Sequence, residues 1–429
     1  QGVSSAASDV YKRQIQKLIT RNRGGDPIGL PCFCTSNEHV LRTILAFTGK
    51  HDLPAVIEAT CNQVNQDGGY TGMTPSDFIS WLTKMAQEAG VPMSNLILGG
   101  DHLGPNPWRS EPLEQAMKKA RELVRLFVES GFTKIHLDAS MACGGEPNPS
   151  FEKIAERTAD LCAMAERFAP DPSALVYVIG TEVPIPGGEK EEPELLDVTS
   201  EDRLMATVET HRQAFNAAGL ENAWRRIVAV VTQPGVDFGH SSVFPFVPEK
   251  ANHLRHAILS LPNLTFEAHS TDYQSSGALH ALVQAHFLFL KVGPELTFRF
   301  REAVWALAEI EKQLRLENPS DIRNILEQRM LVYPTNWEDY YSGSDAEMAR
   351  LRVFSYSDRI RYYWSDKVVG QALDRLLTNL KDMPLPETLV SQAFMGFEFG
   401  KIPPLANQLM QDHINLCVSR YFHACGFSF

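Results

Sequence analysis

The stretch "LILGGDHLGPNPW" at residues 96–108 begins as an apolar run and ends in an acid, an imidazole and a Gly-Pro-Asn-Pro segment. Gly99 and Gly100 precede the pair Asp101-His102 and leave room for a bound molecule to approach the main chain. A strand that only fills a core needs no such ending. The pattern therefore predicts a buried strand whose end carries chemistry, provided that other strands of the chain end in the same way.

Seven further apolar runs occur, and small or polar residues follow each of them before the next amphipathic helical pattern. Runs that are apolar throughout are typical of strands covered on both faces. Eight such strands alternating with helices predict a (β/α)8 TIM barrel, with a doubly wound open sheet as the alternative. No Gly-x-Gly-x-x-Gly turn follows the first run, which favours the barrel. The predicted strands are residues 28–34, 55–61, 96–102, 135–140, 175–182, 227–233, 264–270 and 287–293.

We expect the barrel to occupy residues 16–315. Residues 316–429 contain prolines, aromatic–basic clusters and amphipathic helical patterns but no strand-like run, so they predict a helical C-terminal extension that serves as a lid or an oligomer contact. Residues 1–15 are small and polar without an apolar centre, and we expect a disordered or foreign leader there.

The composition limits the partners of the chain. A formal net charge of −12 argues against nucleic acid and anionic membranes, because both require a basic face. No apolar segment reaches the roughly 18 residues of a membrane-spanning helix. The seven cysteines form no Cys-x-x-Cys pair and no export signal is visible, which indicates reduced thiols and a cytoplasmic location.

All eight predicted strands end in polar residues, and in a TIM barrel these ends meet at one rim. A polar ending on a single strand is usually a cap, but eight together predict a shared pocket. The residues at these ends and in the loops after them that we expect to bind substrate are Asn37, Gln63, Asp138, Gln233, Ser270, Asp272 and Lys291.

Two histidines at these ends, His102 and His269, are predicted ligands of a divalent metal, since imidazole suits zinc, manganese and similar ions. Glu182 is predicted both as a third metal ligand and, together with Asp101, as a catalytic residue. Asp101 points away from His102 in a regular strand, but a turn at the strand end would bring it inward as a proton-transfer group. The other histidines considered, which we interpret as structural, are His136, His240, His280 and His286.

The loops after the seventh and eighth strands, "STDYQSSG" (270–277) and "KVGPELT" (291–297), are rich in hydroxyl groups and small residues. In TIM barrels this pair of loops often binds phosphate through backbone N–H groups. We therefore expect a phosphate site there, although a Ser/Gly-rich turn is often an ordinary loop.

Long motifs resemble the Z-type subunit family of class II D-tagatose-1,6-bisphosphate aldolases from about residue 16 onward. They are "GGDHLGPNPW", "IHLDAS", "IGTEVPIPGG", "FEAHSTDYQ", "LKVGPELTFRFREA" and "YSDRIRYYW". That family is often described as a non-catalytic or stabilising subunit, and sometimes as a tagatose-6-phosphate kinase. The sequence contains no Gly-x-x-x-x-Gly-Lys-Ser/Thr loop, which argues against a kinase.

The resemblance to the catalytic class II aldolases extends to single residues. It implies that Asp101 transfers the proton, that His102 binds zinc and that His269 begins a zinc and phosphate loop. Their Glu-x-Gly-x-x-Gly-Gly-Glu segment resembles residues 182–189, and their Lys-Val-Asn segment resembles 291–293. The second zinc histidine of those aldolases falls near Thr232-Gln233, where this chain has none. Because of this missing histidine, we expect a metal site with two histidines that Glu182 or Gln233 completes.

The leading functional hypothesis is a metal-dependent ketohexose-phosphate 4-epimerase that interconverts fructose 6-phosphate and tagatose 6-phosphate. A divalent ion, zinc first and otherwise Mn, Ni, Co or Mg, would polarise the C2 carbonyl, so that the C3–C4 bond breaks and re-forms on the other face. The alternatives are an accessory subunit that stabilises a catalytic aldolase subunit, and the bisphosphate aldolase itself, for which Arg359 or Arg361 could serve a second phosphate. We also expect a homo-oligomer.

Overall fold

The computed structural model describes residues 5–183, 196–394, 396–397 and 404–429, and it confirms the (β/α)8 barrel. Eight parallel strands close in the order β1-β10-β9-β6-β5-β4-β3-β2. Their bounds are β1 Leu30–Cys34, β2 Ala55–Thr60, β3 Leu96–Leu103, β4 Lys134–Leu137, β5 Val176–Ile179, β6 Ile227–Val231, β9 Thr265–Ala268 and β10 Phe287–Val292. A short antiparallel pair, β7 Asp237–Phe238 and β8 Val243–Phe244, lies between β6 and β9 in sequence.

Amphipathic helices surround the strands because each has one apolar face to bury. The largest hydrophobic cluster lies between these helices and the outer face of the barrel. The helices around the barrel are α2 Glu38–His51, α3 Pro75–Glu88, α4 Leu113–Glu129, α5 Phe151–Phe168, α6 Glu201–Ala217, α7 Glu221–Trp224, α8 Asn252–Ser260, α9 Ser276–Gln284 and α10 Pro294–Leu314. Among the described residues, none of these helices or the others is both long and apolar enough to cross a membrane.

The first helix overlaps the segment in which we expect a leader. Helix α1 runs over Ser5–Arg23, so residues 5–15 lie within a helix that continues into the fold. Ile15 and Ile19 are buried in one cluster with Leu30 and Leu288, which stand at the beginning of β1 and β10. Helix α1 thus covers the N-terminal end of the barrel, opposite the end where a TIM barrel carries its chemistry.

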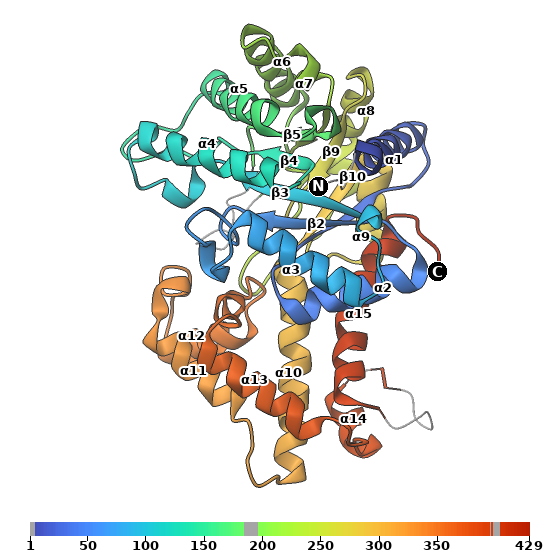
Figure 1. The fold of residues 1–429 in the computed structure, drawn as a ribbon, viewed down its shortest axis with the longest axis vertical. Helices are drawn as coiled ribbons and strands as arrows, with labels where there is room; N and C mark the ends of the chain where they lie inside the picture. Colours follow the sequence, from blue (N-terminus) through green and yellow to red (C-terminus); the bar gives the residue numbers. More distant parts are fainter. Residues whose placement is uncertain (1–4, 184–195, 395, 398–403) are drawn as a thin grey trace.

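The residues after α10 form a helical lobe below the barrel (Figure 1). It contains α11 Ile322–Val332, α12 Asp345–Phe354, the short helix η7 Arg359–Tyr363, α13 Lys367–Leu380 and α14 Glu387–Ala393. The last helix, α15 Ala406–Ala424, returns beside α10 and packs on α2, α9 and β1. The rings of Phe47 and Phe422 stack there with centroids 5.6 Å apart. The C-terminal segment is therefore packed against the barrel, because its last helix belongs to the layer of helices around the strands.

Gly99 and Gly104 in the 96–108 stretch each lie where a side chain would collide with a neighbouring segment, and the neighbour differs between the two. A Cβ on Gly99 would lie 2.6 Å from the Glu58 side chain, and the paired register Glu58–Gly99–Lys134 runs across β2, β3 and β4. The missing side chain lets the Glu58 carboxylate reach Lys134 Nζ at 2.6 Å across the middle strand. A Cβ on Gly104 would lie 1.6 Å from the carbonyl oxygen of Asp138.

We expect Gly104→Ala to lower the free energy of unfolding by about 3 kcal/mol, because the backbone of the strand β4 end must move away from the added methyl group. Urea unfolding followed by circular dichroism measures this change. The matched control is Gly277→Ala, where the nearest atom to a Cβ is 4.0 Å away. Equal stability of the two variants would contradict the close approach of these two segments.

Candidate functional site

Three buried histidine rings face one another at the C-terminal rim of the barrel. His102 comes from β3, His136 from β4, and His269 follows β9 directly. The ring centroids of His102 lie 4.9 Å from those of both His136 and His269, and the latter two are 5.1 Å apart. The three imidazoles thus form a nearly equilateral triangle.

Each of these rings is held by a buried carboxylate through one of its two nitrogens. The pairs are His102 Nδ1 with Asp138 at 2.8 Å, His136 Nδ1 with Asp101 at 2.8 Å, and His269 Nε2 with Glu267 at 2.9 Å. A carboxylate that accepts the proton of one ring nitrogen fixes the tautomer and leaves the lone pair of the other nitrogen available, as in known carboxylate–histidine–metal groups.

The remaining nitrogens suit a divalent metal. Asp101, His102, His136 and His269 each offer one donor atom, and these atoms lie within 4.8 Å of one another. His136 Nε2 is buried and has no hydrogen-bond partner among the described residues. Burial lowers the pKa of His136 and, more strongly, that of His269, so both rings are neutral near pH 7 and able to bind a cation. The donor set fits zinc or a similar ion.

The backbone explains why Asp101 and His102 both face this site although they are consecutive. His102 has a φ of +49°, in the left-handed region that a non-glycine residue seldom adopts. This conformation breaks the strand alternation, which would otherwise send one of the two side chains to the opposite face. Both residues line the cavity, as expected from the turn at the strand end.

A network of buried charges lies beneath the imidazoles. Lys291 on β10 makes a short ion pair with Asp101 and lies 3.4 Å from Glu58 and 3.6 Å from Glu267. Burial favours the neutral acid, but the charges of His102 and Lys291 outweigh it and hold the pKa of Asp101 well below its usual range. Burial also disfavours the charged lysine, but the neighbouring carboxylates raise the pKa of Lys291. Asp101 is therefore ionised and Lys291 protonated near neutral pH.

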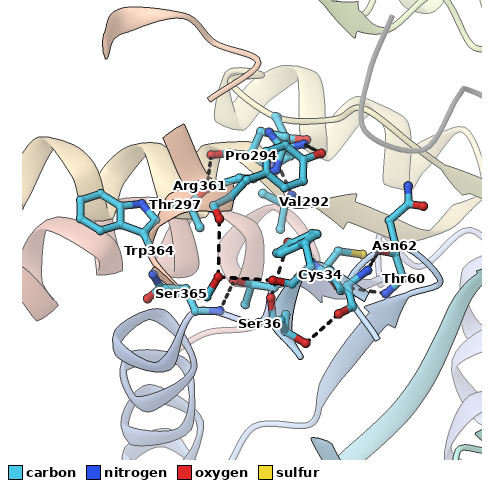
Figure 2. A pocket seen from close by; sticks show the side chains of 18 of the residues that line it. Cys34, Ser36, Thr60, Asn62, Val292, Pro294, Thr297, Arg361, Trp364 and Ser365 are labelled. Atoms are coloured by element: carbon cyan, nitrogen blue, oxygen red, sulfur yellow. Dashed lines mark hydrogen bonds between the residues drawn. The ribbon is translucent and has the colours of Figure 1, made fainter. Parts of the chain in front are cut away.

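A cavity of about 440 Å³ opens above these groups. Of the residues predicted to bind substrate, Asn37, Gln63, Ser270, Asp272 and Lys291 line it. Figure 2 shows that its wall combines barrel residues with residues of the C-terminal lobe. The barrel gives Cys34, Ser36, Thr60, Asn62, Val292, Pro294 and Thr297, and the lobe gives Arg361, Trp364 and Ser365.

Two of these predicted residues have local structural bonds. Asn37 Oδ1 accepts a hydrogen bond from the Val40 N–H and caps α2. Asp272 Oδ1 accepts from the N–H groups of Gly293 (2.9 Å) and Glu295 (2.8 Å) at the beginning of α10. Burial raises the pKa of Asp272 to about 7. The predicted phosphate loop after β10 is thus already occupied by a carboxylate of the protein.

Glu182 and Gln233 do not reach the site, which corrects both predictions. Strand β5 ends at Ile179, and the following chain turns outward, where Glu182 pairs with Arg203 at 2.9 Å and accepts from Thr199 at 2.6 Å. The side-chain Oε1 of Gln233 accepts hydrogen bonds from the backbone N–H groups of Gly235 and Val236 in its own loop. Neither residue lines the cavity.

Asp138 and Arg359 also lie behind the cavity wall. Asp138 is 2% exposed and acts on the site through His102, which it orients, rather than by touching a bound molecule. The guanidinium of Arg359 packs on the rings of Tyr340 and Tyr362 and donates to the Asn336 carbonyl. The arginine that lines the cavity is Arg361, two residues further along.

His136 is the site residue that the sequence interpretation assigned to structure. Polar side chains stand at every second position along β4 and just after it, at Lys134, His136 and Asp138, and apolar Ile135, Leu137 and Ala139 alternate with them. This period of two places all three on the inner face of the barrel. The alternation was the available signal, and it also points to the buried Lys134.

We expect Asp138→Asn to weaken the affinity for a divalent metal by about 10- to 100-fold, since an amide no longer stabilises the His102 tautomer that leaves Nε2 free. Competition with a chromophoric chelator measures this affinity. Asp160→Asn, which changes a half-buried acid on α5 paired with Arg121, is the control with unchanged affinity. Equal affinities of the two variants would contradict a metal at His102.

Comparison with known proteins supplies the family. The family described as "D-tagatose-1,6-bisphosphate aldolase subunit GatZ/KbaZ-like" matches residues 15–426. The chain belongs to this family. This GatZ/KbaZ-like chain is similar to the solved structure of a probable tagatose 6 phosphate kinase from Sinorhizobium meliloti 1021, with 41% identity and a TM-score of 0.85. The match covers 92% of this chain and 100% of that protein's chain.

More distant solved structures include two aldolases. The YdjI aldolase from Escherichia coli K12 has 13% identity, covers 84% of this GatZ/KbaZ-like chain and 98% of its own, and has a TM-score of 0.42. The fructose-bisphosphate aldolase from Campylobacter jejuni has 12% identity, with 86% and 92% covered and a TM-score of 0.44. These values are too low to inform the function.

Proposed function

We propose that this protein is a metal-dependent ketohexose-phosphate 4-epimerase acting on fructose 6-phosphate and tagatose 6-phosphate. The observation that carries the proposal is the triangle of carboxylate-held imidazoles, two of which, His102 and His269, line a cavity of this chain. A chain that only stabilised another subunit would have no need to bury three imidazoles, each oriented by its own acid, under an open pocket. Burying such polar groups has a cost that a function would explain.

A divalent ion held by His102, His136 and His269 would polarise the C2 carbonyl of a bound ketose. Asp101 is ionised and lines the cavity, so it is placed to accept the proton of the C4 hydroxyl. Loss of that proton, cleavage of the C3–C4 bond and passage of the electron pair to the C2 carbonyl give an aldehyde and an enediolate. Re-addition to the other face of the aldehyde inverts C4 and returns the proton.

Other groups of the chain hold the sugar and its charges. Lys291 keeps Asp101 ionised but lowers the basicity of its carboxylate. Asp101 therefore becomes a stronger base toward a hydroxyl once the substrate displaces its contact with Lys291. The amides of Asn62 and Gln63 and the hydroxyl of Thr60 line the cavity, and groups of this kind bind sugar hydroxyls.

The second candidate is the accessory subunit, which the family description favours because it names an aldolase subunit. In that case a catalytic aldolase subunit would be the partner, and the cavity of this chain would not turn over substrate alone. Phosphoryl transfer from ATP has no support from the sequence, which lacks a Gly-x-x-x-x-Gly-Lys-Ser/Thr loop.

The purified chain is expected to convert fructose 6-phosphate to tagatose 6-phosphate without a partner. Chelation should lower turnover at least about 100-fold, because the C2 carbonyl is then no longer polarised. Adding Zn, Mn, Ni, Co or Mg should restore turnover. Product formation is followed by anion-exchange chromatography. Asp101→Asn should abolish turnover with the fold intact by circular dichroism. Absence of turnover with every metal, together with stabilisation of an aldolase partner, would favour the accessory subunit instead.

A further inference from the structure

The C-terminal lobe gives the cavity a wall of its own. Helix η7 and the residues after it contribute Arg361, Tyr362, Trp364 and Ser365. The ring of Tyr362 meets that of Tyr70 from the barrel with centroids 4.7 Å apart, and Ser365 Oγ donates to the Tyr70 carbonyl oxygen at 3.3 Å. These contacts fix the lobe against the barrel beside the cavity, which Tyr70, Tyr362 and Ser365 all line.

The cavity lining holds two permanent cations, Lys291 and Arg361, among the described residues. Lys291 is surrounded by Asp101, Glu58 and Glu267, so its charge is already more than compensated. No carboxylate of the described chain forms an ion pair with Arg361. The lining also contains the acids Glu38, Asp101, Asp237, Asp272 and Asp374. Asp358 lies outside the lining and interacts electrostatically with Arg361 without forming an ion pair. Among the described lining residues, Arg361 is therefore the cation that an entering anionic group meets with no carboxylate in direct contact.

Hydrogen bonds hold the Arg361 guanidinium while leaving part of it available. Its Nη1 donates to the carbonyl oxygens of Ser357 and Asp358, and its Nη2 donates to the Tyr362 hydroxyl at 3.0 Å. These contacts use three of the five N–H groups of an arginine. Two N–H groups remain, which is the number that a bidentate contact with a phosphate requires.

Two further observations agree with an anion site at this wall. The backbone N–H groups of Gly293 and Glu295, where a TIM barrel often binds phosphate, are taken by Asp272. Burial raises the pKa of Tyr362, but the charges of Arg361 and Arg359 outweigh it and leave the pKa below its usual value. The local potential is thus positive at the lobe wall and not at the β10 loop.

We propose that Arg361 binds the phosphate group of a sugar-phosphate substrate, so that the C-terminal lobe selects phosphorylated over free ketoses. The inference rests on the proposed function for the identity of the sugar. The phosphate would bind between η7 and the rim of the barrel, with the guanidinium donating to its oxygens.

Calorimetric titration of the full chain with fructose 6-phosphate, fructose and inorganic phosphate tests the proposal. Arg361→Gln should weaken binding of fructose 6-phosphate and of inorganic phosphate about 100-fold, as expected for loss of a buried charge-assisted contact. Arg361→Lys keeps the positive charge but loses the paired N–H groups of the guanidinium, so its affinity for fructose 6-phosphate should lie between those of the wild type and Arg361→Gln. Arg329→Gln, a lobe arginine paired with Asp366 away from the cavity, is the matched control with wild-type binding.

The outcomes separate this inference from the proposed function. If fructose 6-phosphate binds in a way that depends on Arg361 but is not epimerised, the phosphate site is supported and the proposed epimerase activity is ruled out. Epimerisation with equal affinity for fructose and fructose 6-phosphate overturns the phosphate site alone. If Arg361→Gln does not fold, equal binding by Arg361→Lys and the wild type overturns it, as does a wild-type chain that binds neither phosphate compound.

Discussion

Replacing His136 with alanine is expected to reduce bound metal from about one ion per chain to a small fraction and to lower turnover at least about 100-fold. Loss of even an outer carboxylate that supports a metal ligand weakens affinity by about 10- to 100-fold, and loss of the ligand itself costs more. His136 is 0% exposed, with one nitrogen held by Asp101 and the other unpartnered among the described residues. Metal content measured by plasma mass spectrometry on the purified variant checks the first part directly.

The matched control is His211→Ala. His211 is as deeply buried as His136, and its Nδ1 donates to the Thr207 carbonyl oxygen on its own helix, α6. It should lose stability but keep its metal. If the His136 variant retains one tightly bound ion, the triangle of imidazoles is a packed polar core and the metal-dependent mechanism is wrong.

Replacing Lys134 with methionine is expected to lower the free energy of unfolding by about 3–5 kcal/mol, the usual result of removing one partner from a buried ion pair. Lys134 Nζ lies 2.6 Å from Glu58 and 2.5 Å from Glu267, and all three side chains are fully buried. Without the lysine, two carboxylates face each other inside the barrel with only Lys291 to compensate them. Urea unfolding gives the change in free energy.

Lys153→Met is the control for this prediction. Its ion pair with Glu156 has nearly the same length, 2.7 Å, but both side chains are more than half exposed, so the change should stay within about 1 kcal/mol. Adding Glu58→Gln to the Lys134 variant should recover part of the loss, because it removes an uncompensated charge. A Lys134 variant as stable as the wild type would show that the network is better solvated than its burial indicates.

The eight strands could be predicted because a strand covered on both faces is mostly apolar, and eight mostly apolar runs are visible in the sequence. The rim could be predicted in part, because polar endings at parallel strands converge. Glu182 and Gln233 could not be placed correctly, since a periodic pattern does not show where a strand gives way to a loop that turns outward. Strand β5 stops at Ile179, and three residues suffice to remove Glu182 from the site.

His136 shows a different limit. It lies inside a strand, and an interior histidine is usually a satisfied core residue, so its function is visible only when two other imidazoles are placed around it. Arg361 likewise depends on tertiary structure, because nothing local distinguishes it from Arg359. The two differ in what surrounds each guanidinium, which the fold of the lobe decides.

The return of α15 to the barrel has a consequence for synthesis of the protein. Strand β1 pairs with β2 on one side and with β10 on the other, and α15 then packs over β1. A nascent chain leaving the ribosome therefore exposes one edge of β1 until β10 has emerged, and the apolar surface around Phe47 until α15 has emerged. We expect the growing chain to depend on chaperones during this interval and to acquire ligand binding only after α15 has emerged and packed on the barrel.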